Sequence, residues 1–155
     1  FSNADLSFFE FSDCVFDHCN LSLIKMTKTA CSDVQFIHCK MLGINFENCS
    51  EFLFSVAFNS CVLNFSSFYT RNFQKTAFIG CSLQEADFTG ADLSQANFSQ
   101  ADLAGAKFEN SNLEKADFRS ALNYSIDPGI NRIRKAKFSL SGLGGLLDKY
   151  DIDIS

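Results

Sequence analysis

Ala86-Asp-Phe-Thr-Gly90, Ala91-Asp-Leu-Ser-Gln95, Ala96-Asn-Phe-Ser-Gln100 and Ala101-Asp-Leu-Ala-Gly105 follow one another without a break in this chain of 155 residues. Each block has a small residue, then Asp or Asn, then Phe or Leu, so that a large apolar side chain recurs at every fifth position. A helix repeats every 3.6 residues and a strand every two, so neither element alone would keep these side chains on one face. The five-residue period therefore predicts a repeat architecture.

The apolar residue in the middle of each block, which we call the centre of a module, can be followed through most of the chain. The centres keep one frame from Leu6 to Phe46 and a second frame from Leu53 to Phe118. The step from Phe46 to Leu53 takes seven residues instead of five. We therefore expect two inserted residues within 47–52, in a small bulge or loop.

The blocks resemble the motif of the pentapeptide-repeat family, which is a small residue, Asp or Asn, Leu or Phe, Ser or Thr, and then any residue. Ala86-Asp-Phe-Thr-Gly90 matches this motif, and the resemblance covers about residues 4–140. It implies an all-β fold, the right-handed quadrilateral β-helix, also called the pentapeptide-repeat solenoid. In that fold four pentapeptides make one square coil of twenty residues.

The centres also repeat at intervals of twenty once the insertion is allowed for. One face then carries Phe at every level, and the neighbouring face carries mostly Leu or Met, whereas a wrong coil length would mix the two. Because coils stack at the strand spacing of ~4.8 Å, like residues lie above like in one continuous core. The predicted core ladder is Phe16, Phe36, Phe58, Phe78, Phe98, Phe118 and Phe138, beside Leu21, Met41, Leu63, Leu83, Leu103 and Asn123.

The repeat divides the chain into a β-helix over residues 1–138 and a C-terminal cap over residues 139–155. The last coil, 119–138, is degenerate, because Asn123, Pro128 and Ile133 stand at its centres and Asp-Pro-Gly at 127–129 predicts a turn.

Leucines recur at helical spacing after residue 139, so we expect a short helix that ends near Tyr150, with Ser139 or Ser141 as its N-cap. The alternation at 151–154 predicts a short strand. The N-terminus has no comparable cap, so either a capping segment is missing or the first coil is an exposed edge.

Seven cysteines and two histidines raise the question of a disulfide or a metal site. His18 and His38 each precede a cysteine that occupies a small inward position, so the four side chains cannot converge on a tetrahedral metal. We expect a stacked, solvated His pair, no metal site and no cofactor. We interpret Cys14, Cys19, Cys39, Cys49, Cys61 and Cys81 as interior space-fillers and Cys31 as a centre. Free thiols also favour a reducing compartment, the cytoplasm.

Asp87, Asp92, Asp102 and Asp117 look like an acidic row, but they fall on four different faces of the coil. We expect them to accept hydrogen bonds from nearby backbone N–H groups rather than to form a catalytic pair. The chain has no nucleophile elbow and no phosphate loop, so it is not expected to be an enzyme.

The net charge of −5 argues against direct binding to nucleic acid, which needs a basic surface. No apolar run is long enough to cross a membrane. Residues 76–120 carry seven acids and three bases, a net charge of −4, whereas residues 121–155 carry four acids and five bases, a net charge of +1. The rod is therefore acidic and its C-terminal end mildly basic, with Arg132, Arg134, Lys135 and Lys137 close together.

The C-terminal part, with Ala121-Leu-Asn-Tyr-Ser-Ile-Asp-Pro128 and Leu146-Leu-Asp-Lys-Tyr-Asp-Ile152, resembles the ending of the quinolone-resistance (Qnr-type) pentapeptide proteins. The resemblance implies a homodimer that joins two rods end to end, with a dimer contact made by Leu143, Leu146, Leu147 and Tyr150. It also implies an acidic rod that imitates duplex DNA, binds the type II topoisomerases DNA gyrase or topoisomerase IV, and protects them from quinolones. The alternative is a generic protein–protein interaction scaffold with an unknown partner.

Overall fold

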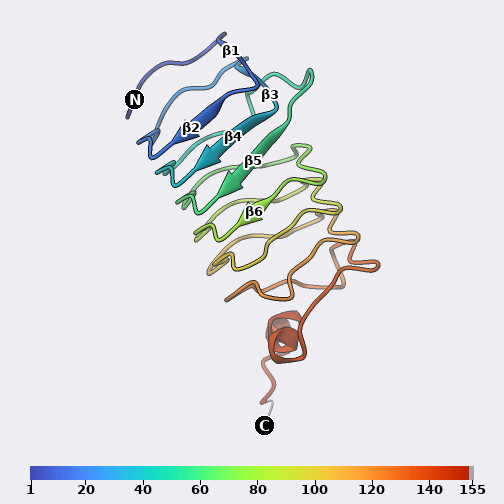
Figure 1. The fold of residues 1–155 in the computed structure, drawn as a ribbon. Helices are drawn as coiled ribbons and strands as arrows, with labels where there is room; N and C mark the ends of the chain where they lie inside the picture. The colour runs from blue at the N-terminus through green and yellow to red at the C-terminus, as the bar shows by residue number, and fades with distance from the viewer. Residues whose placement is uncertain (154–155) are drawn as a thin grey trace.

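The computed structural model describes residues 1–153 and shows a β-solenoid whose coils stack along one axis (Figure 1). The N-terminus lies at one end of the stack and the C-terminal helical segment lies beyond the last coil at the other end. The fold class that the repeat predicts is confirmed.

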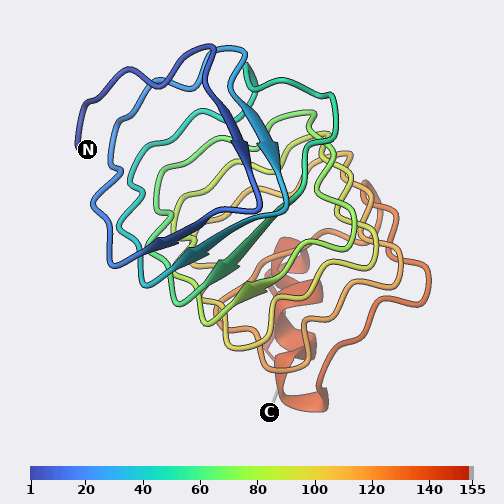
Figure 2. The same ribbon diagram turned by 45° about the horizontal axis from the view of Figure 1, so that its top comes forward.

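Neighbouring coils are joined by parallel pairing. The strands β1 and β3 form one two-stranded sheet, and β2, β4, β5 and β6 lie side by side in a second sheet (Figure 2). Beyond β6 the coils are joined by single parallel bridges between residues twenty apart, such as Asn97 with Asp117. The strands are β1 (Glu10–Ser12), β2 (Val15–Asp17), β3 (Ala30–Ser32), β4 (Val34–Ile37), β5 (Val56–Asn59) and β6 (Phe78–Ile79).

A tight turn at the end of most modules makes the corners of the coil. In the module centred on Leu93, the Leu93 carbonyl accepts a hydrogen bond from the N–H of Ala96 at 3.0 Å, and Gln95 between them has a φ of 61°. A positive φ at the third residue is typical of a type II turn. Gly90 occupies the same place in the preceding module with a φ of 69°. The motif's free fifth position is therefore a corner whose side chain faces solvent.

Two ladders of Phe rings fill the core. Rings of the ladder predicted from the sequence stack between Phe16 and Phe138 with centroids 4.8 to 5.4 Å apart and planes within 13°. A second ladder, which the sequence analysis did not single out, has centroids 4.6 to 5.1 Å apart. The two ladders meet edge to face, as Phe88 and Phe98 do at 5.8 Å and 87°, a favourable ring geometry. The second ladder is Phe46, Phe68, Phe88 and Phe108.

The insertion is real, but one expected centre beside it is wrong. β4 and β5 pair Phe36 with Phe58, twenty-two residues later, as two inserted residues require. Leu53, expected as a centre, has a φ of 51° and is 65% exposed. Phe54 packs on the core instead and meets Phe73 edge-on at 5.5 Å. The extra residues rotate the chain so that Leu53 turns outward and the next residue turns inward.

The last coil also departs from the expected centres. Asn123 is exposed with a φ of 57°, and Tyr124 and Ile126 are buried in its neighbourhood. The predicted turn is present, because Gly129 N–H donates to Asp127 Oδ1 at 2.7 Å. A positive φ at Asn123 shifts the inward-facing position by one residue, which the motif alone does not predict.

The C-terminal cap consists of two short 3-10 helices, η1 (Leu140–Leu146) and η2 (Asp148–Tyr150). Ser139 is the N-cap, as expected. The three glycines of the cap disfavour a longer α-helix. The strand predicted at 151–154 is wrong for residues 151–153, which have no regular secondary structure. Ile154 lies outside the described residues.

Candidate interaction surface

The cap is seated on the end of the solenoid through Tyr124. The Tyr124 ring lies 5.7 Å from Phe138 and 5.8 Å from Phe118, so it continues the aromatic core toward the cap. Gly142 and Gly145 of η1 lie so close to Tyr124 that a Cβ on either glycine would overlap its atoms. Burial raises the pKa of the Tyr124 hydroxyl. The absence of side chains at these two glycines is what lets the cap approach.

Two further contacts hold the cap in place. The N–H of Ile126 donates to the carbonyl oxygen of Gly145 at 2.8 Å, which joins η1 to the last coil. Lys149 Nζ donates to Asp127 Oδ1 at 2.6 Å, which joins η2 to the turn. The hydrogen bond from Lys149 lowers the pKa of the Asp127 carboxyl below its usual value.

The four residues predicted to form a dimer contact do not all lie on one free face. Leu146 packs against the core and Leu147 is half-buried, whereas Leu143 and Tyr150 are exposed. The structure adds two exposed apolar residues that the sequence analysis did not include, Leu140, which is 90% exposed, and Ile152. The helical spacing of the leucines does not predict which side of the cap packs on Tyr124 and which side faces solvent. We call the exposed set the cap face: Leu140, Leu143, Tyr150 and Ile152.

The motif aspartates make the local hydrogen bonds expected of them. Asp87, Asp92 and Asp102 each accept a hydrogen bond through Oδ1 from the backbone N–H two residues later, at 2.9 to 3.2 Å. Asp117 does the same with Arg119 at 3.1 Å. Each of the four aspartates pairs with non-acidic residues in the neighbouring coils, as Asp102 does with Ser82. No two of the aspartates share a column of paired residues, so the four carboxylates lie on different faces.

The Asp102 and Asp117 carboxylates remain charged at neutral pH. Hydrogen bonds from Asn123 and then Gln84 lower the pKa of Asp102, and the Arg119 guanidinium lowers the pKa of Asp117. The acidic character of residues 76–120 therefore belongs to the folded surface. Glu85 and Glu109 add exposed carboxylates that accept no hydrogen bond from a turn N–H within residues 1–153, although Glu85 itself occupies a turn corner with a φ of 56°.

A buried arginine holds the insertion loop, and the sequence analysis missed it. Arg71 occupies a position that the motif reserves for a small residue, yet it is only 6% exposed. Its guanidinium donates to Glu51 Oε1 at 3.1 Å and to the carbonyl of Ser50 at 3.2 Å, and lies 5.3 Å from the centre of the Phe54 ring. The sequence contains a signal for this contact. Arg71 stands at an inward position that the motif gives to a small residue, so its side chain needs extra space, and the insertion within 47–52 supplies that space.

Most of the cysteines lie inside the solenoid, as expected. Cys31, Cys39, Cys49, Cys61 and Cys81 are buried, and Cys14 and Cys19 are half-buried. Burial raises the pKa of the Cys31 thiol to about 12 and that of Cys49 to about 11. These thiols stay protonated at neutral pH and are poor nucleophiles and poor metal ligands.

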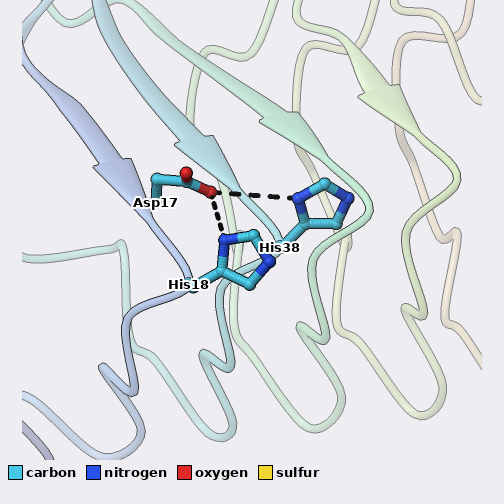
Figure 3. A group of neighbouring side chains, drawn as sticks. All are labelled: Asp17, His18 and His38. Carbon is cyan, nitrogen blue, oxygen red and sulfur yellow. Dashed lines mark hydrogen bonds and ion pairs between the residues drawn. The ribbon is translucent and has the colours of Figure 1, made fainter.

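The histidine pair lies on the outer surface beside β2 and β4 (Figure 3). The rings of His18 and His38 lie 4.7 Å apart, as the predicted stack requires. The structure also brings Asp17 to them, with Asp17 Oδ1 at 2.7 Å from His18 Nδ1 and at 3.8 Å from His38 Nδ1.

Across residues 1–153, no helix has the length and apolar character needed to cross a membrane.

Residues 81–121 match the family model "Pentapeptide repeats" in eight copies. The chain has the pentapeptide-repeat fold. Two solved structures of trypsin-treated variants of QnrB1, a plasmid-mediated fluoroquinolone resistance protein, are similar to this chain. The first is 23% identical with a TM-score of 0.56, and the second is 21% identical with a TM-score of 0.53. Each match covers 99% of this chain and 84% of the other. No functionally curated protein has a matching sequence.

Proposed function

We propose that this protein is a non-enzymatic acidic rod that forms a homodimer through the cap face and binds a type II topoisomerase, which it protects from fluoroquinolones in the cytoplasm. The observation that carries the proposal is the likeness to QnrB1, which extends over 99% of the chain and so includes the cap as well as the coils. QnrB1 is a fluoroquinolone resistance protein.

The negative charge of the rod supports the proposal that it binds to a surface of the partner that normally binds DNA. Between residues 76 and 120 the charged side chains sum to −4. The motif aspartates among them lie on different faces of a regular stack of coils (Figure 1). A DNA-binding enzyme offers a basic groove, so electrostatic attraction would steer such a rod into it. Replacing Glu85 and Glu109 by Gln removes two charges but no turn hydrogen bond, because neither carboxylate accepts one from the described backbone, which makes the effect of the charge testable.

The decisive experiment is a supercoiling assay with purified gyrase, with and without a fluoroquinolone. We expect the protein to restore supercoiling in the presence of drug or to inhibit the enzyme in its absence. The double variant Glu85→Gln/Glu109→Gln should act at a higher concentration than wild type, whereas Glu10→Gln/Asp13→Asn, which removes the same charge near the N-terminus, should act like wild type. No effect at tens of micromolar would exclude gyrase as the partner and leave a scaffold for another protein.

The cap face supports the dimer. Leu140, Leu143, Tyr150 and Ile152 expose apolar surface at one end of the rod, where a second copy would cover it. Wild type should be a dimer by light scattering at micromolar concentration, and Leu143→Asp should be a monomer. Leu23→Asp changes a similarly exposed leucine far from the cap and should leave the dimer intact. A monomeric wild type would exclude the dimer.

A further inference from the structure

We propose that Asp17, His18 and His38 form a surface site for a divalent cation of the Zn²⁺ class, which fastens the first coil to the second. His18 and Asp17 belong to the first coil, at the end of β2, and His38 follows β4 in the second coil. One potential ligand atom from each side chain lies within 4.8 Å of the other two. The site is open to solvent, with all three residues exposed.

The chemistry of the donors favours a borderline divalent cation. Two imidazoles and one carboxylate suit Zn²⁺, Ni²⁺ or Cu²⁺, whereas Ca²⁺ and Mg²⁺ prefer a shell of oxygen ligands. Tetrahedral bonds of about 2.1 Å place the donor atoms about 3.4 Å apart. Asp17 Oδ1 and His18 Nδ1 must therefore separate from 2.7 Å, and Asp17 Oδ1 and His38 Nδ1 must approach from 3.8 Å. Exposed side chains can make this adjustment by rotation about χ1 and χ2. Water would complete the coordination.

The site differs from the set of two histidines and two cysteines that the sequence analysis excluded. Cys39 is buried and its Sγ donates to the carbonyls of Phe16 and Ile37, so it points away from the histidines. Asp17 replaces the cysteines as the third ligand. It reaches both rings because parallel pairing places Asp17 in register with Ile37, next to His38.

The position of the site gives the cation a structural effect. Phe16 of the first coil is only half-buried, whereas Phe36 and Phe58, in register with it in the next two coils, are buried. Phe11 is likewise half-buried, whereas Cys31 in register with it is buried. The first coil therefore has less apolar burial to hold it than the coils after it. A cation that bridges the two coils stabilises the pairing of β2 with β4, and with it the N-terminal end of the rod.

The test is a Zn²⁺ titration of the full chain without a polyhistidine tag, by isothermal calorimetry in a phosphine reductant. We expect one Zn²⁺ per chain. His38→Asn and Asp17→Asn should each weaken binding by at least about tenfold, because even the loss of a group that only supports a metal ligand costs about 10- to 100-fold. Asn is the replacement for His38 because the residue has a φ of 50°, which Asn adopts more readily than Ala. Asp13→Asn removes an exposed acid of the same coil and should bind like wild type.

Two further readouts separate this site from adventitious binding to thiols. Cu²⁺ bound to wild type should give an electron paramagnetic resonance spectrum with two nitrogen ligands, and His38→Asn should lose one. The amides of Gln35 and Lys40, which bond to the carbonyls of Cys14 and Cys19, should exchange more slowly with Zn²⁺ present. No binding at about 1 mM Zn²⁺, or binding that survives His38→Asn and is lost in Cys14→Ala/Cys19→Ala, would overturn the proposal.

Discussion

The rings of Phe78 and Phe98 stack with their centroids 5.0 Å apart and their planes 4° from parallel, although twenty residues separate them in the chain. Phe88, halfway between them in sequence, stands nearly perpendicular to both, at 5.8 Å from each. The core is therefore built from two interlocked stacks. From Phe46 to Phe118, each ladder ring has neighbours in its own ladder and in the other.

We expect Phe78→Ala to lower the free energy of unfolding by about 3–5 kcal/mol, because it opens a cavity in the middle of both stacks. Urea denaturation followed by circular dichroism measures the change. Phe65→Ala is the control, since Phe65 is 66% exposed and its loss should cost less than about 0.5 kcal/mol. Equal effects at the two positions would contradict the proposed role of the ladders.

We expect Gly145→Ala to displace the cap from Tyr124, because the new methyl group would overlap the Tyr124 carbonyl and ring. Backbone atoms cannot yield as a flexible side chain does, so a loss of about 1–3 kcal/mol is expected. Hydrogen exchange at the amide of Ile126, which bonds to Gly145, should become faster.

Gly144→Ala is the matched control for this change, because a Cβ at Gly144 meets no atom within 4 Å. It should leave the cap in place and stabilise it slightly by restricting the unfolded chain. If both glycine variants weaken the cap alike, close packing on Tyr124 is not what holds it.

We expect Arg71→Met to free the insertion loop, because the carbonyl of Ser50 and the side chain of Glu51 lose their shared partner. Limited proteolysis with chymotrypsin, which cleaves after exposed aromatic residues, should then cut faster after Phe52, which is 77% exposed. Glu51→Gln should change the rate little, since a pair with an exposed carboxylate contributes at most about 1 kcal/mol. A large effect of Glu51→Gln would locate the restraint in the ion pair instead of the buried arginine.

We expect stability to fall as the pH rises above about 9. The folded state raises the pKa of Cys31 to about 12 and of Cys49 to about 11, from 9.0. Between these values the unfolded thiols lose protons that the folded thiols keep, so alkaline pH favours unfolding. Each fully titrating thiol contributes up to about 1.4 kcal/mol per pH unit. Urea denaturation at several pH values under reducing conditions, for wild type and Cys31→Ala, measures this, and the variant should show the smaller loss.

The five-residue period by itself determined the solenoid, the coil of twenty residues, the first Phe ladder, the inward cysteines and the site of the insertion. It could do so because a stacked coil repeats the same environment at every level, so the side chain that faces inward is a property of the position in the motif. The local hydrogen bonds of the motif aspartates were predictable for the same reason.

Tertiary structure decided everything that breaks the repeat. Whether Leu53 or Phe54 enters the core depends on how two extra residues are accommodated between paired coils, and Arg71 is buried only because that loop makes room for it. The register between coils likewise decides that the cap packs on Tyr124 and that Asp17 lies close to His38. Contacts of this kind join residues about twenty positions apart, and their geometry is set by packing that no single module contains.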